Sequence, residues 1–224
     1  MKKLLFKSIL LLIFPFFIIN CSSDDTEITS NAIINTTEAN AQITFTSIKI
    51  SGKVISNDGN TITSQGICWS KNPNPTISNE KITETTTTFT SVIQDLTVNT
   101  TYYFKVFATT IVGTAYSKEL TLKTLPLGNT IWNFTITNHT GTEILAKVNF
   151  NEDQTTKYEE SNCVDCYKAQ GSWSVDGNKL TYIGENSDPA TSTHVYTGTF
   201  TGLTMQGTYD HLIDPDGTWT AILQ

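Results

Sequence analysis

From residue 31 onward, apolar and polar residues alternate in short runs, which is the pattern of β-strands. The runs are rich in Thr, Ile, Val, Phe and Tyr and are separated by Gly, Asn and Asp, as expected where strands end in tight turns. No segment sustains the apolar repeat of an amphipathic helix. The pattern predicts an all-β protein, and a break in composition at residues 125–129 predicts a linker between two domains.

Residues 31–125 form the first predicted domain. Residues 43–56 alternate as one strand, residues 66–70 follow as the next, and residues 115–124 are expected to return as a last strand after a turn at Gly113. Trp69 is interpreted as core, because a buried aromatic residue dominates a small sandwich. Cys68, on the opposite face of the same strand, is interpreted as a small buried apolar residue and not as a nucleophile.

One motif of this domain resembles the fibronectin type III fold. Leu96, a polar turn and Tyr102 six residues later stand where that family has the corner that enters its strand F. The resemblance implies a β-sandwich in which the Tyr102 ring lies in the core and its hydroxyl bonds to nearby backbone. The Gly-Ile-Cys-Trp-Ser strand at residues 66–70 is similar to a variant common in Bacteroidetes surface proteins.

Residues 129–224 form the second predicted domain, with seven or eight short strands in up-and-down order. Alternation places Trp132, Phe134 and Ile136 on one strand face. Glycines stand two residues from large aromatic residues in four of the strands, where a missing side chain lets a sheet curl and leaves room for a neighbouring ring. This pattern favours a small closed barrel.

The second domain resembles the short lipocalin-like domains of bacterial lipoproteins. The resemblance rests on residues 150–153, on Gly171-x-Trp173, on the turn at 176–180 and on the early Trp132. The predicted fold class is therefore a fibronectin type III-like β-sandwich followed by a small antiparallel lipocalin-like β-barrel. Five aromatic residues could line a ligand cavity in such a barrel or could simply form its core: Trp132, Trp173, Tyr182, Tyr196 and Trp219.

The N-terminus indicates export and lipid attachment. Three lysines precede an apolar stretch that is too short for a comfortable membrane span, so residues 1–20 are predicted to be a signal peptide and not an anchor helix. Ile-Ile-Asn-Cys at residues 18–21 resembles the lipobox of bacterial lipoproteins, which implies acylation of Cys21. The polar, acidic residues 21–30 are interpreted as a tether. Cys-Ser-Ser-Asp-Asp at residues 21–25 is similar to the surface-export signal of Bacteroidetes lipoproteins, which implies an outer-membrane, lipid-anchored and surface-exposed protein.

The charge of the chain argues against nucleic acid as a partner. The net charge is −7, all 14 basic residues are lysine, and removal of residues 1–20 takes away three lysines and no acid, which leaves −10. An acidic protein without arginine is a poor ligand for phosphate backbones.

Cys163 and Cys166 form the most conspicuous chemical motif. A local disulfide is the preferred interpretation, because exported proteins favour disulfides, whereas thioredoxin-type chemistry needs a helix after the first cysteine. Zinc would need two further ligands, and the three histidines are scattered. We predict no metal, no cofactor and no catalytic residues.

These observations favour a non-enzymatic envelope lipoprotein whose sandwich is a spacer and whose barrel binds an extracellular glycan, a small apolar ligand or another envelope protein. A purely structural envelope component is the first alternative. A polymer-degrading hydrolase is the second, although the sequence places no carboxylate pair at the separation that glycoside hydrolysis requires.

Overall fold

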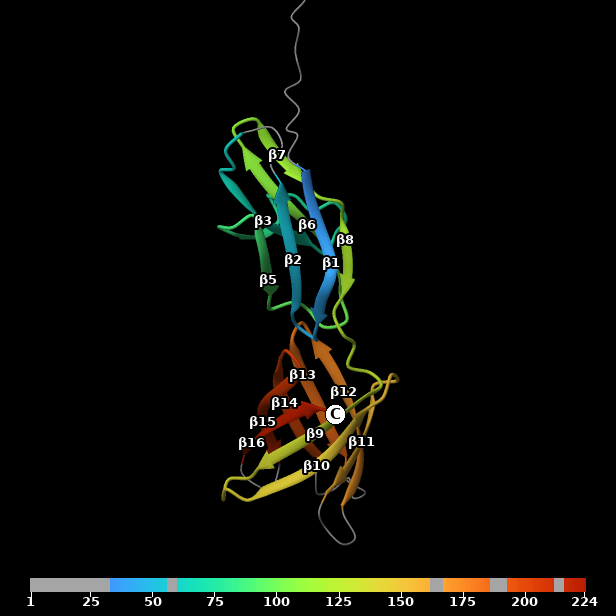
Figure 1. The fold of residues 1–224 in the computed structure, drawn as a ribbon. Helices are drawn as coiled ribbons and strands as arrows, with labels where there is room; N and C mark the ends of the chain where they lie inside the picture. The colour runs from blue at the N-terminus through green and yellow to red at the C-terminus, as the bar shows by residue number, and fades with distance from the viewer. Residues whose placement is uncertain (1–32, 56–59, 162–166, 186–192, 212–215) are drawn as a thin grey trace, which may run out of the picture.

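The computed structural model describes residues 33–55, 60–161, 167–185, 193–211 and 216–224, with backbone alone for residues 33–41 and His211. These residues form strands, turns and loops and no helix, which confirms the all-β prediction. Within the described ranges, no helix is available that could cross a bilayer. Figure 1 shows a sandwich and a barrel stacked end to end.

The first eight strands build two sheets that face each other. One sheet has the order β1-β2-β5. The other has the order β4-β3-β6-β7, with β8 also paired to β6. The strands are β1 (Ile33–Ile43), β2 (Ile48–Ile55), β3 (Ser64–Ser70), β4 (Glu80–Thr83), β5 (Thr88–Ile93), β6 (Thr101–Thr110), β7 (Gly113–Tyr116) and β8 (Leu120–Lys123).

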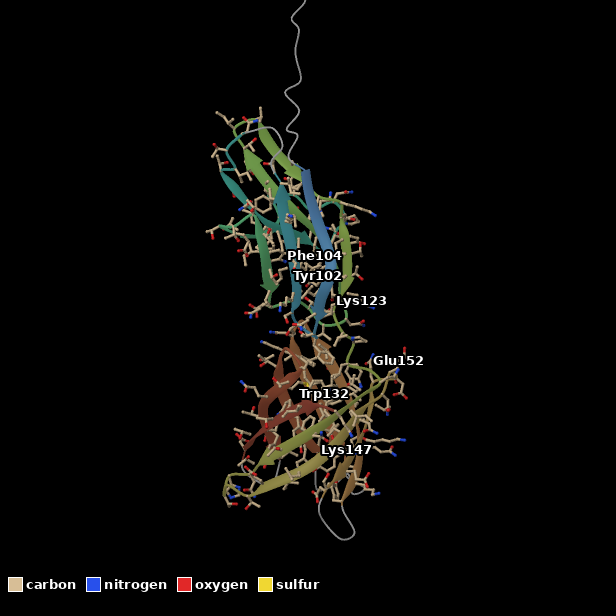
Figure 2. The ribbon with its side chains drawn as sticks, in the orientation of Figure 1. Tyr102, Phe104, Lys123, Trp132, Lys147 and Glu152 are labelled. Atoms are coloured by element: carbon tan, nitrogen blue, oxygen red, sulfur yellow. The ribbon has the colours of Figure 1, made fainter. Side chains whose placement is uncertain are left out.

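Inward-facing residues of both sheets form one apolar core, which includes Ile48, Ile67 and Phe104. Tyr102 lies in this core beside Phe104 (Figure 2), and its hydroxyl accepts a hydrogen bond of 2.9 Å from the backbone N–H of Thr97. This is the corner that the sequence predicted. Cys68 is buried as expected, and burial raises the pKa of its thiol to about 11. Trp69 is partly buried and packs against the same core.

Two of the predicted strands are each divided in two. Residues 43–56 contain the end of β1, a turn at residues 44–47 and then β2, because the Thr44 hydroxyl accepts the backbone N–H of Ser47 and closes the turn. Residues 115–124 contain β7 and β8, because Ser117 bonds to both backbone groups of Val106 and interrupts the ladder between them. In both places a side chain replaces ladder hydrogen bonds, which alternation of polarity alone does not reveal.

The last eight strands close into an antiparallel barrel in simple up-and-down order, with β9 paired to both β10 and β16. This confirms the predicted barrel. The strands are β9 (Thr130–Thr137), β10 (Glu143–Phe150), β11 (Thr155–Glu160), β12 (Lys168–Asp176), β13 (Lys179–Glu185), β14 (Thr193–Thr201), β15 (Thr204–His211) and β16 (Gly217–Leu223).

Gly198 leaves space for a tryptophan ring inside the barrel. Gly198 of β14 is the register partner of Gly207 of β15, which in turn is the partner of Trp219 of β16. A Cβ on Gly198 would lie 2.4 Å from Cζ2 of the Trp219 ring. The indole N–H of Trp219 donates to the carbonyl of Thr208 at 3.0 Å. Gly198 therefore lets a large ring lie close against the sheet, as the sequence pattern suggested, whereas a Cβ on Gly207 would meet the backbone of Thr197.

The sandwich contributes a side chain to the interior of the barrel. Phe45, at the tip of the β1–β2 turn, is fully buried in the barrel cluster, with its ring centroid 5.2 Å from that of Trp132 and 5.4 Å from that of Phe200. The backbone N–H of Val98 also donates to the carbonyl of Gly177 in the β12–β13 turn. The turns of the sandwich thus cover the adjacent end of the barrel.

The predicted linker is packed and not a free tether. Leu127 is 2% exposed within the barrel cluster. The backbone N–H of Leu125 donates to the carbonyl of Thr44, and the carbonyl of Leu125 accepts from Asn99. Phe45 and Val98 of the sandwich belong to the barrel cluster, whereas the sandwich core forms a separate cluster. The contacts of Leu125 and Leu127 fix the connection between the two units.

Candidate functional site

The barrel interior is filled at the end near the sandwich and hollow at the far end. Near the sandwich, Trp132, Phe150 and Trp219 are each at most 1% exposed, and Figure 2 shows Trp132 inside the barrel on that side. At the opposite end lies a cavity of about 110 Å³, lined by inward-facing residues of several strands. This distal cavity is the candidate functional site.

Five tyrosines line the distal cavity, and the strand register explains why they gather there. Tyr182 on β13, Tyr196 on β14 and Tyr209 on β15 are register partners on three successive strands. All three side chains face inward at the period of two that a β-strand imposes. Their rings form a row: Tyr182 stacks on Tyr196 with centroids 4.9 Å apart, and Tyr209 lies 5.5 Å from Tyr196.

Tyr158 and Tyr167 form the other side of the cavity beside Glu160. Their ring centroids lie 6.0 Å apart in an edge-to-face arrangement. The backbone N–H of Glu160 donates to the carbonyl of Tyr167 at 3.0 Å, which keeps these residues together at the end of β11. Burial first and the nearby Glu160 carboxylate second raise the pKa of both phenols.

His194 and Gly184 also line the cavity. The His194 ring lies 6.2 Å from Tyr196 and 6.3 Å from Tyr209. Gly184 contributes no side chain, and a Cβ there would meet the Tyr182 hydroxyl at 3.3 Å. Gly184 therefore keeps open part of the space that the tyrosines surround.

The buried tyrosines predict a loss of stability at high pH. Burial raises the pKa of Tyr158, Tyr182 and Tyr196 above the ordinary value of 10. The contribution of each phenol to the free energy of unfolding is complete below pH 10 and is lost as the pH rises above 10. The reason is that tyrosines of the unfolded chain ionise above pH 10, while the folded barrel holds these phenols neutral. We expect the part of the phenolate absorbance that comes from these buried tyrosines to appear only together with loss of β-sheet circular dichroism, above about pH 10. Full ionisation within an intact barrel would contradict this.

The structure brings together two of the five aromatic residues predicted to contact a ligand. Tyr182 and Tyr196 line the distal cavity. Trp132 and Trp219 lie in the filled part of the interior, against Phe45 and Phe134 respectively. Trp173 lies at the near end, where its indole N–H donates to the carbonyl of Asn151. Sequence reasoning missed Tyr158, Tyr167, Tyr209, Glu160 and His194, because only the register shows that they meet.

Three larger hollows, of about 580, 620 and 680 Å³, lie outside the barrel interior. The first lies between the sandwich and the barrel and includes Trp173. The second and third lie over the outward-facing side chains of β10–β12 and of β13–β16. Lysines, threonines and carboxylates alternate there as on any solvated strand face, so size alone does not make these hollows the better candidates.

The lipidation and disulfide predictions concern Cys21, Cys163 and Cys166, which lie outside the described residues. Across the part of the chain that is described, no group of three or more His, Cys, Asp or Glu side chains could hold a metal ion. Glu160 is the one carboxylate among the described residues that line the distal cavity. These residues therefore do not present the carboxylate pair on which glycoside hydrolysis depends.

Comparison with protein families, with curated proteins and with solved structures finds no match to this chain.

Proposed function

We propose that this chain is an envelope lipoprotein of the bacterial surface, anchored through Cys21, whose barrel binds a small extracellular ligand at its distal cavity. The observation that carries the proposal is the convergence of five tyrosines, His194 and Glu160 on one hollow in an otherwise filled barrel. Apolar walls with a few polar groups are the usual composition of a ligand site.

The path of the chain supports the spacer role of the sandwich. β1 begins at the end of the sandwich that lies away from the barrel, and the distal cavity lies at the opposite end of the barrel (Figure 1). A lipid on Cys21, upstream of β1, would hold the sandwich toward the membrane and the cavity away from it. The packed connection at Leu125 and Leu127 would keep the two units in line.

The anchor is tested by replacing Cys21 with serine. We expect the variant to leave the membrane fraction, because bilayer attachment depends on the buried methylenes of the acyl chains, at about 0.8 kcal/mol each. Wild-type protein expressed in the same cells is the control, and fractionation followed by immunoblotting is the measurement. Retention of the serine variant in washed membranes would rule out lipid anchoring.

The ligand site is tested with a variant whose cavity is filled. Gly184→Val places methyl groups in the hollow without removing an aromatic ring, and the Tyr182 hydroxyl is the nearest atom that must yield. We expect some compounds from a panel of glycans, lipids and small amines to raise the melting temperature of the Cys21→Ser protein. The same compounds should not stabilise the Gly184→Val form. An equal rise in melting temperature in both proteins would mean that the compounds bind outside the distal cavity.

A purely structural role is the second candidate, and the filled near end of the barrel favours it. Phe45 closes that end against Trp132 and Phe200, so the interior there has no space for a ligand. If no compound in the panel stabilises the protein and filling the distal cavity raises the melting temperature, the structural role becomes the better account.

A further inference from the structure

We propose that the distal cavity is an aromatic cage for a small organic cation, such as the trimethylammonium or protonated amine end of a larger molecule. This inference rests on the proposed ligand-binding function and names the chemistry of the ligand. The cavity volume of about 110 Å³ has room for about four water-sized groups. That is the size of a headgroup and far below a cavity for a whole drug-sized ligand.

The tyrosine rings provide walls that attract a cation. Tyr182, Tyr196 and Tyr209 present a row of rings on three neighbouring strands, and Tyr158 with Tyr167 lies on the other side of the hollow. Tyr182 and Tyr196 stack on each other with centroids 4.9 Å apart, so the two faces between them are not open to a ligand. A cation is attracted by each remaining ring face that it reaches within about 6 Å. Methyl groups on the cation would also replace water against these apolar walls.

The charges around the cavity select a cation over an anion. The Glu160 carboxylate lines it, and no lysine is among the described residues that do so. The carboxylate acts on the rings themselves, since its charge contributes to the raised pKa of Tyr158 and of Tyr167. An anion would be repelled by the Glu160 carboxylate.

A neutral ligand is the remaining alternative, and the cavity chemistry disfavours it. An apolar group would displace water from the Glu160 carboxylate and would supply no positive charge in its place. A cation of the same shape makes the same apolar contacts and adds attraction to the carboxylate and to the ring faces. The difference in affinity between two such ligands therefore tests the proposal directly.

The test compares choline with dimethylbutanol, its neutral isostere in which a tert-butyl group replaces trimethylammonium. The protein is the mature chain with Cys21→Ser, and binding is measured by calorimetric titration. We expect choline to bind about tenfold more tightly than the isostere. Equal binding of the two would overturn the cation proposal and leave ligand binding at the cavity intact.

Adjacent residues on one strand provide a matched pair of variants. Glu160→Gln removes the carboxylate that lines the cavity, whereas Glu159→Gln removes one from the outer face of β11, where Glu159 pairs with Lys168 at 2.8 Å. We expect Glu160→Gln to weaken choline binding about threefold, which is part of the tenfold preference, without changing binding of the isostere. Glu159→Gln should change neither. Tyr167→Leu should weaken the binding of choline more than the binding of the isostere. Unaltered melting temperatures establish that each variant is folded.

The remaining outcomes separate this proposal from the proposed function. If neither choline nor tetramethylammonium binds while a glycan or lipid stabilises wild type and not Gly184→Val, the cation proposal fails and the ligand site stands. If choline binds Gly184→Val as well as it binds wild type, the cage is not its site and the cation proposal fails. If no compound distinguishes the two proteins, both proposals fail.

Discussion

Replacing Gly198 with valine is expected to destroy the closed barrel, or to destabilise it by about 3 kcal/mol or more. The first added carbon would lie 2.4 Å from Cζ2 of Trp219 and 2.5 Å from the backbone carbonyl oxygen of Gln206. Neither can move freely, because Trp219 is 1% exposed and stacks on Phe134, while Gln206 is paired in the β14–β15 ladder.

Chemical denaturation followed by tryptophan fluorescence measures this effect. Thr197→Val is the control, since it places the same side chain at the adjacent, exposed position of the strand, where a β-branched residue of similar shape already stands. The control should remain within about 0.5 kcal/mol of wild type. A Gly198→Val protein that unfolds at the wild-type denaturant concentration would show that Trp219 does not depend on this close approach.

Replacing Phe45 with alanine is expected to destabilise the barrel by about 3–5 kcal/mol, although the residue belongs to a turn of the sandwich. The Phe45 ring is fully buried against Trp132 and Phe200. Its removal leaves a cavity at the near end of the barrel and exposes Trp132 to water. The barrel should therefore unfold earlier, with a red-shifted tryptophan emission.

The control for this prediction removes a ring from the sandwich core alone. Phe89 is 6% exposed and belongs to the sandwich cluster, so Phe89→Ala should destabilise the sandwich with less effect on barrel emission. Hydrogen exchange of the β9 amides would locate the effect of Phe45→Ala. Unchanged protection of β9 would mean that the Phe45 ring does not stabilise the barrel interior.

The distal cavity could be predicted only in part from the sequence. Alternation showed that Tyr182 and Tyr196 face the same interior, because the side-chain period of a strand is fixed by local geometry. It could not show that Tyr158, Tyr167 and Tyr209 reach the same hollow. Nor could it separate these residues from Trp132 and Trp219, since a packed aromatic residue and a cavity wall have the same local pattern.

The sequence by itself determined the all-β class, the up-and-down barrel, the Tyr102 corner and the glycines that face large rings. The strand pattern and the glycines depend on side-chain size and polarity within a few residues of chain, and a resemblance to known families also implied the corner and the barrel. Only the tertiary structure decided that the turn at Phe45 closes the barrel and that Leu127 packs inside it. Only the tertiary structure also placed the hollow at the far end of the barrel. These features depend on contacts between residues far apart in the chain. The alternation of apolar and polar residues does not indicate which turn contacts which end of the barrel.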